Sequence, residues 1–227
     1  MEFRNGAFME SLRRVMQSGY YESRAYSVLL LKSILELGDP MHLVGLKPEY
    51  FGELVQVLKD QISHQASKAT LKTLIHACPW GRNRVKAVES GAVSVLIDLL
   101  LDCNERRTCE MMLMVLDMLC ACAEGRAELL GHGAGLAIVS KKILRVSMVA
   151  SEKAVRILSS ISRFSATKSV VQEMLQLGVV AKLCLVFVHG DSGSKTKEKA
   201  REILKMHAGA WRNSSCIPTS LISSYPS

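Results

Sequence analysis

Residues 83–96 read NRVKAVESGAVSVL: a short run with apolar residues at helical spacing, a glycine, and a second such run. The same arrangement recurs at residues 125–138 (GRAELLGHGAGLAI) and at residues 170–183 (VVQEMLQLGVVAKL). The glycines at the centres of these segments lie 42 and 45 residues apart: Gly91, Gly133 and Gly178. A recurrence at this interval indicates a chain built from repeated structural units.

Each repeated segment predicts two helices joined at its glycine. Because glycine has no Cβ, it can end a helix in the left-handed conformation and let the next helix leave at a sharp angle. We expect Gly91, Gly133 and Gly178 all to adopt this conformation. Apolar residues continue at helical spacing beyond the first of these glycines: Val93, Leu96, Ile97 and Leu100.

A longer helix is predicted before each pair, at residues 66–78, 105–122 and 151–164. Three helices in each unit and an interval in the ~40–47 residue range are typical of armadillo repeats. The sequence therefore predicts an all-α fold, an armadillo-type right-handed superhelical solenoid. In such a fold each repeat buries its apolar face against its neighbours.

The repeat pattern extends less regularly toward both ends. Residues 20–37 predict another long helix, and residues 6–15 resemble a post-glycine helix whose partners are missing. Residues 195–210 predict a polar, lysine-rich helix that caps the stack. We therefore expect an armadillo array over residues 1–211, with about four to five repeats of which the first is truncated. Residues 212–227 are expected to form a poorly ordered tail.

Composition agrees with helices and narrows the class of protein. Hydrophobic residues make up 48% of the chain and aromatic residues only 5%, which favours Leu, Val, Ala and Met packing between helices over a β-sandwich. The seven cysteines include no Cys-x-x-Cys pair, so we interpret them as small buried apolar residues and expect no metal site. No apolar stretch approaches the ~20 residues of a membrane span. The net charge of +8 leaves nucleic acid, an anionic membrane and an acidic protein open as partners.

The post-glycine helices of an armadillo stack line its concave surface, which makes their polar residues candidates for a partner groove. These candidates are Glu53, Gln56, Ser94, Asp98, Lys141, Lys142, Arg145 and Lys182. The alternative is an ordinary solvated face. Within this set, Lys141, Lys142 and Arg145 form a basic cluster that suits an acidic partner. No nucleophile, base and orienter occur together in a recognisable motif, so we expect no catalytic and no cofactor-binding residues.

Two other features have a structural interpretation. Trp80 follows a proline at a helix junction, and we expect it to be buried between repeats. The basic side chains of residues 195–205 are interpreted as a solubilising cap, because no stacking aromatic residues are interleaved with them, and nucleic acid is therefore not expected as a partner. The post-glycine helices also lack the Trp and Asn that importin-type grooves use to bind nuclear signals.

Several longer segments resemble one family. Residues 78–91, 115–130, 139–146, 174–183 and 204–211 are similar to the C-terminal armadillo region of plant U-box ubiquitin ligases, in particular the group linked to immune and drought signalling. The resemblance implies a substrate-binding module of an E3 ubiquitin-protein ligase that acts in stress or immune signalling. It also implies a protein substrate or adaptor as partner, and a cytoplasmic location with the nucleus as an alternative.

The U-box of such ligases recruits the ubiquitin-charged conjugating enzyme, and its motif is not found in this sequence. Only five residues precede Gly6, and Cys78-Pro79 is followed by Trp80 where the family's opening has isoleucine. We therefore expect contact with a conjugating enzyme only through a missing U-box. The alternative is a standalone armadillo adaptor or scaffold that acts without ubiquitin transfer.

Overall fold

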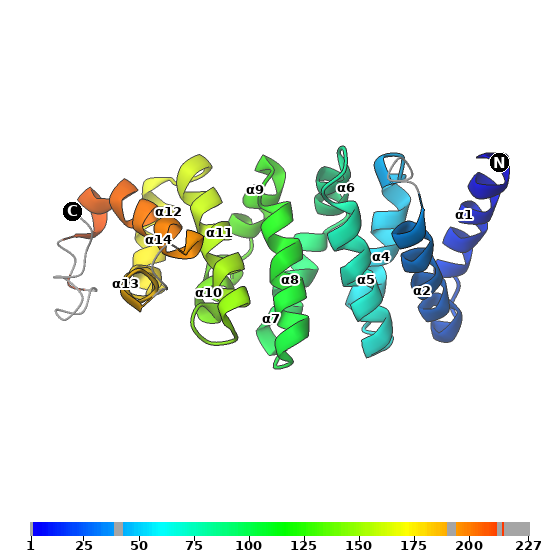
Figure 1. The fold of residues 1–227 in the computed structure, drawn as a ribbon, viewed down its shortest axis with the longest axis horizontal. Helices are drawn as coiled ribbons and strands as arrows, with labels where there is room; N and C mark the ends of the chain where they lie inside the picture. The colour runs from blue at the N-terminus through cyan, green and yellow to red at the C-terminus, as the bar shows by residue number, and fades with distance from the viewer. Residues whose placement is uncertain (1, 39–42, 190–193, 213–214, 216–227) are drawn as a thin grey trace. The chain divides into compact units, whose positions relative to one another are not determined.

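The computed structural model describes residues 2–38, 43–189, 194–212 and 215, with the backbone alone for residues 2–6. Within these residues all regular structure is helical, without strands, so the predicted all-α fold is confirmed (Figure 1). The chain divides into two compact units, Met1–Leu99 and Leu100–Ser227. Most of the predicted tail lies outside the described residues and stays a prediction.

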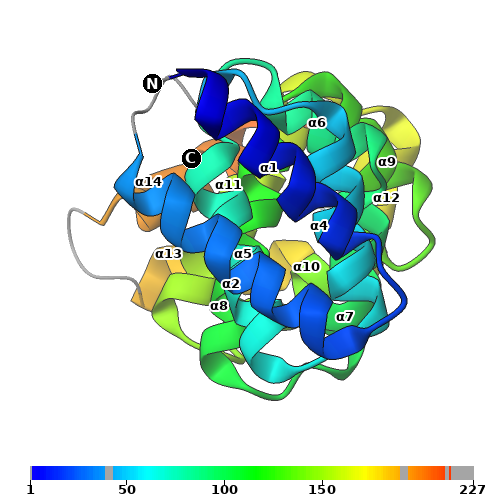
Figure 2. The same ribbon diagram turned by 90° about the vertical axis from the view of Figure 1, so that its right-hand side faces the viewer.

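The first unit consists of helices packed through their apolar faces. They are α1 (Glu2–Met16), α2 (Tyr21–Leu37), α4 (Pro48–Asp60), α5 (His64–Ala77), α6 (Asn83–Glu89) and most of α7 (Ala92–Asp102). Figure 2 shows α1 alongside α2, and α4 contacts both of these helices. α2 also packs against α5. Arg24 of α2 links three helices, because its guanidinium donates to the Met16 carbonyl at 3.0 Å and pairs with Asp60 at 2.7 Å.

The second unit continues the same order of a long helix, a short helix and a post-glycine helix. Its helices are α8 (Arg106–Leu119), α9 (Ala123–Gly131), α10 (Gly135–Lys142), α11 (Met148–Phe164), α12 (Lys168–Gln176), α13 (Val179–His189), α14 (Lys195–Met206) and α15 (Ala208–Trp211). α11 packs against both α8 and α14, as Figure 1 shows. Its face toward them is fully buried at Ala154, Val155 and Leu158.

Side-chain caps explain where the long helices begin. Ser63 accepts a hydrogen bond from the Ala66 amide at the start of α5, and Ser147 accepts one from the Ala150 amide at the start of α11. Glu105 caps α8 in the same way through its carboxylate. These oxygens satisfy amide groups that a helix leaves without partners in its first turn. Each cap therefore sets the boundary between one repeat and the next.

Buried hydrogen bonds between residues about one repeat apart hold the stack together. Asn83 donates to the carbonyl of Leu43 at 2.6 Å, a separation of 40 residues. In the second unit, Ser160 donates to the Cys120 carbonyl at 2.7 Å across the same separation. The Trp211 indole donates to a carbonyl of α12 at 3.0 Å, again 40 residues away. The repeat found in the sequence is therefore also a repeat of polar contacts, in which a side chain of one repeat satisfies a backbone carbonyl of the repeat before it in the same unit.

The glycine prediction is confirmed at two of three junctions. Gly91 and Gly178 have left-handed φ values of +82° and +70°. The prediction is wrong for Gly133, which does not have a left-handed φ. α9 there extends to Gly131, and the chain turns through His132. The imidazole Nδ1 of His132 accepts a hydrogen bond from the Ala134 amide, and the His132 carbonyl accepts one from the Gly135 amide. These bonds complete the turn, so no left-handed residue is needed.

Two further expectations are wrong. Trp80 is 39% exposed rather than buried, because it lies in a turn outside the helices, where its backbone amide donates to the Ala77 carbonyl. The single helix predicted over residues 195–210 is broken at His207, which separates α14 from α15. The capping role of α14 agrees with its buried face of Ala200, Ile203 and Leu204.

Among the described residues, no single helix is long and apolar enough to cross a membrane. α12 and α13 meet the requirements of length and composition only when taken together, and they are bent by 71° at their junction.

Candidate partner-binding site

The eight predicted groove residues fall into two sets, one in each unit. Glu53 and Gln56 of α4 belong to the first unit, as do Ser94 and Asp98 of α7. Glu53 accepts a hydrogen bond from Gln17 at 2.8 Å. Gln56 donates to the Asp60 carboxylate at 2.7 Å. These side chains are partly or fully exposed, and their role in binding stays a prediction.

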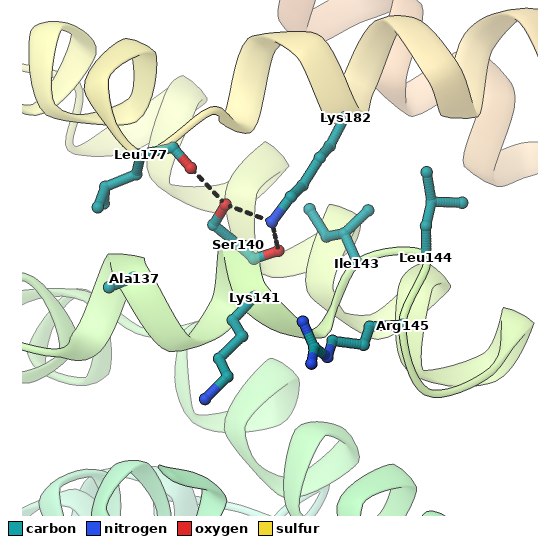
Figure 3. A pocket seen from close by; sticks show the side chains of 8 residues that line it. All are labelled: Ala137, Ser140, Lys141, Ile143, Leu144, Arg145, Leu177 and Lys182. Carbon is teal, nitrogen blue, oxygen red and sulfur yellow. Dashed lines mark hydrogen bonds between the residues drawn. The ribbon is translucent and has the colours of Figure 1, made fainter.

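Three of the four residues in the second set come together around a cavity. Lys141, Arg145 and Lys182 line a pocket of about 390 Å³ together with Ser140 and the aliphatic side chains beside it. We call it the basic pocket. In Figure 3, Lys182 reaches from α13 toward Ser140, while Lys141 and Arg145 project from the α10 side. Three of the predicted groove residues therefore line one cavity, although they are 41 residues apart at the extremes, and their role in binding stays a prediction.

The prediction that Lys142 faces outward with them is wrong. Lys142 is 5% exposed, and its ammonium donates to the Cys103 carbonyl at 3.0 Å and to the Cys109 sulfur at 3.7 Å. Successive side chains on a helix leave about 100° apart, so Lys141 and Lys142 cannot share a face. The buried lysine satisfies a carbonyl just beyond α7, which is a structural role.

Lys182 is fixed in place by the end of α10. Its ammonium donates to the Ser140 carbonyl at 2.6 Å and to the Ser140 hydroxyl at 3.1 Å. That hydroxyl donates in turn to the Leu177 carbonyl at 2.9 Å, just before α13 (Figure 3). A cation is favourable at the carboxyl end of a helix, where carbonyl groups lack partners. The pocket therefore contains one positioned ammonium group as well as two exposed cations.

The positive charge of the basic pocket is not neutralised from within. None of its three cations has a carboxylate within ion-pair distance in the described part of the chain. Other arginines of the same unit are paired: Arg156 lies 2.8 Å from Asp117, and Arg163 lies 2.6 Å from Glu202. Burial, and next the positive charge of Arg145, lowers the pKa of Lys182 below its ordinary value. An anionic group in this pocket would remove that repulsion.

A second pocket of about 400 Å³ adjoins the first and shares Leu144 and Arg145 with it. Most of its wall is apolar, from Val146, Met148 and Val186 among others, and we call it the apolar pocket. Sequence analysis missed this pocket. Its residues come from the loop after α10, the start of α11, the end of α13 and the start of α14, and no periodicity relates these segments. The only signal was a methionine at the start of α11, which is 75% exposed.

Leu144 forms the partition between the two pockets and has an unusual backbone. Its φ is +59°, in the left-handed region that a bulky side chain rarely adopts. The Leu144 amide donates to the Ser151 hydroxyl at 2.9 Å, which holds the loop in this conformation. As a result the side chain is displayed to solvent, with 55% of its surface exposed. Strained residues of this kind concentrate at binding and active sites.

The two pockets differ in the chemistry that they offer a ligand. Among the described residues, the Ser140 hydroxyl is the only hydroxyl lining the basic pocket, and it is 1% exposed with its proton donated to Leu177. The basic pocket therefore offers positive charge, and the apolar pocket offers a place to bury a hydrocarbon side chain.

The repeat order, the polar contacts one repeat apart and these pockets can be compared with known proteins. A sequence model of the family described as "Plant U-box protein ARM repeat region" matches residues 1–227. The chain belongs to this family. The resemblance inferred from the sequence segments is thereby confirmed.

Relatives in this plant U-box family are similar over nearly the whole chain. The Arabidopsis thaliana E3 ubiquitin-protein ligase PUB22 is 59% identical over 221 residues, which cover 96% of this chain and 51% of that protein. PUB23 of the same plant is 58% identical, with 96% and 54% covered. PUB24 is 37% identical, with 96% and 56% covered. The chain thus spans about half the length of the relatives it matches.

Solved structures show that the fold is of the armadillo type. A computationally designed armadillo repeat protein for modular peptide recognition superposes with a TM-score of 0.71 at 18% identity, over 87% of this chain and 81% of that one. Another designed armadillo repeat protein, solved in complex with the peptide (KR)4, has a TM-score of 0.68 at 19% identity, over 86% and 80%. The predicted armadillo fold is therefore confirmed, while the handedness of a superhelix over the whole chain stays a prediction.

Proposed function

We propose that this chain is the substrate-binding module of a plant U-box E3 ubiquitin-protein ligase. The observation that supports this most is the family match over residues 1–227, together with the E3 ligase names of the relatives of which it spans about half. In this proposal the armadillo repeats hold a protein partner, and a U-box holds the ubiquitin-charged conjugating enzyme. The repeats accelerate transfer by raising the local concentration of the acceptor lysines.

The cellular setting belongs to the same proposal. We place the module in stress or immune signalling, in the cytoplasm with the nucleus as a second compartment. Support comes from the segments that resemble the immune and drought group of these ligases. The pockets of the second unit add support at the level of chemistry, because paired polar and apolar cavities suit side chains of a protein.

A chimera tests the proposal. The part of PUB22 outside the matched region is joined to this chain and supplied with activating enzyme, conjugating enzyme, ubiquitin and ATP. Proteins that copurify with this chain should become ubiquitinated by the chimera. They should stay unmodified in a control chimera that has a designed armadillo repeat protein in its place.

Two outcomes would contradict the proposal. If the copurifying proteins bind the chimera but stay unmodified, the chain acts as an adaptor without ubiquitin transfer. If no protein is bound, the module has no substrate-binding role. The chain without added PUB22 sequence should give no autoubiquitination.

A further inference from the structure

We propose that the basic pocket and the apolar pocket together bind one extended protein segment, which places an aspartate or glutamate side chain in the first and an apolar side chain in the second. The inference deepens the proposed function, since it rests on the chain being a protein-binding module and names the chemistry of what it binds. The site is contained in the second unit, between α10, α13 and the loop that follows α10.

The charge of the basic pocket selects for carboxylates. Lys141 and Arg145 are exposed, have no carboxylate partner in the described chain, and flank an ammonium group that Ser140 holds in place. A flexible cation loses side-chain entropy when it binds, whereas Lys182 is already ordered by its two hydrogen bonds. A carboxylate entering the pocket meets donors of three residues, and none of the described residues that line it is acidic (Figure 3).

The apolar pocket selects for a hydrocarbon side chain next to the acids. Met148 is 75% exposed and Leu144 is 55% exposed, so both have apolar surface that a partner can cover. Leu144 and Arg145 line both pockets, so a ligand that fills one pocket lies beside the other. Side chains on the same side of an extended peptide are about 7 Å apart, which lets residues two positions apart enter neighbouring cavities. The expected motif is therefore acidic, any residue, apolar, and a second acidic residue directly before it adds long-range attraction to the cations without entering the same cavity.

A protein segment fits better than nucleic acid. Among the described residues, no Phe, Tyr or Trp lines either pocket, and these are the side chains on which proteins stack the bases of single-stranded nucleic acids. The three cations gather in one cavity instead of following a backbone track, and the adjoining wall is apolar. The exposed leucine between the pockets, held by the Ser151 hydroxyl, has no function toward a phosphate backbone but separates two side chains of a peptide.

The test uses the full 227-residue chain and short fluorescein-labelled peptides in fluorescence anisotropy. The probe peptide contains Asp-Asp-Ser-Leu in a Gly/Ser background, with companions in which Asn replaces both Asp residues or Ser replaces Leu. We expect each companion to bind about tenfold more weakly. The double variant Lys141→Glu with Arg145→Glu should bind the probe peptide at least about tenfold more weakly than the unmodified chain does. Met148→Asp should remove the preference for Leu over Ser.

A matched control has the same change in net charge outside the pockets. Lys168 at the start of α12 and Arg212 after α15 are exposed and line neither pocket. Lys168→Glu with Arg212→Glu should leave the affinity for the probe within about twofold of the unmodified chain. Circular dichroism of both double variants checks that the helices are retained.

Several outcomes would overturn the inference. Equal binding of the Asn companion, or equal losses in the two double variants, would show that the basic pocket does not recognise carboxylates. Binding of a phosphoserine peptide without binding of the Asp probe would assign the pocket to phosphate. Displacement of the probe by a single-stranded oligonucleotide would assign it to nucleic acid. If the peptides do not bind as predicted while the chimera ubiquitinates its partners, only the pocket proposal is rejected. If the peptides bind as predicted while the chimera is inactive, only the ligase assignment is rejected.

Discussion

At the scale of single residues, the glycine that matters between α9 and α10 differs from the one that marks the repeat. Gly133 aligns with the left-handed glycines of the other junctions, yet a Cβ built on it meets nothing within 4 Å. A Cβ on Gly135 would lie 1.9 Å from the carbonyl oxygen of Leu129. Backbone cannot move aside as a flexible side chain can, so α9 and α10 depend on glycine at position 135.

This difference gives a paired prediction. Gly135→Ala should lower the free energy of unfolding by about 2–4 kcal/mol, because α10 must move away from α9. Gly133→Ala should change it by less than about 0.5 kcal/mol, since the added methyl group meets open space. Urea unfolding followed by circular dichroism measures both variants. Equal losses would show that the close approach of α10 to Leu129 is not the constraint.

Leu144 gives a second prediction at this scale. Asn tolerates the left-handed conformation better than Leu, so Leu144→Asn should raise the free energy of unfolding by up to about 1 kcal/mol. The same variant should weaken binding of the acidic and apolar probe peptide, because the partition between the pockets loses its apolar surface. Urea unfolding and anisotropy measure the two effects.

The control makes the same substitution at an ordinary helical residue. Leu101 of α7 is also partly exposed, at 41%, and has a negative φ. Leu101→Asn should lower stability by about 0.5 kcal/mol through helix propensity alone. A loss of stability in both variants would refute the argument that the Leu144 backbone is strained.

At the scale of helices, α8 and α11 are joined by an ion pair between a buried carboxylate and a half-exposed guanidinium. The Asp117 carboxylate is 9% exposed and lies 2.8 Å from the Arg156 guanidinium, which is 47% exposed. Burial raises the pKa of Asp117 above its ordinary value, and Arg156 opposes that shift without cancelling it. The charge of Asp117 therefore weakens the folded state, and Arg156 limits the loss.

The sign of this shift predicts a pH dependence. A carboxyl group whose pKa is raised by folding binds more protons in the folded state, so its contribution to stability is greatest below the ordinary value near 3.8 and is lost as the pH rises through the folded value. Relative to Asp117→Asn, the unmodified chain should therefore gain stability when the pH is lowered from 7 toward 4. Thermal unfolding of both proteins across that range measures the difference. If the unmodified chain instead gains stability relative to Asp117→Asn as the pH rises, the effect of Arg156 on the Asp117 pKa outweighs that of burial.

Periodicity made the helices predictable, and its absence hid the second pocket. Apolar spacing located the long and short helices to within a few residues, and the charges of residues 141–145 indicated a basic cluster, although Lys142 is buried. The sequence could not show which of two adjacent lysines, Lys141 or Lys142, satisfies a buried carbonyl. Nor could it bring together the loop after α10 and the start of α14, because their proximity depends on how α11 and α13 pack.

At the scale of the whole molecule, the net charge of +8 is spread over many surfaces. Binding of an acidic segment depends on where positive side chains have no acidic neighbour. α14 is also rich in lysine and arginine, but acidic residues are interspersed with them: Arg201 lies 3.8 Å from Glu198, and Glu202 pairs with Arg163. The cations of the basic pocket have no such acidic partners among the residues that the structure describes. Long-range attraction is screened within about 8–10 Å at ordinary ionic strength, so local composition decides which surface an acidic segment prefers.

NMR mapping of the peptide complex tests this account most directly. The isotope-labelled chain is titrated with the Asp-Asp-Ser-Leu probe, and the backbone amide shifts are followed. We predict that the largest shifts fall on residues 140–148 and around Lys182, with residues 195–205 nearly unchanged except where α14 borders the apolar pocket. Shifts concentrated along α14, or spread evenly over all basic surfaces, would contradict the claim that the paired pockets recognise the partner.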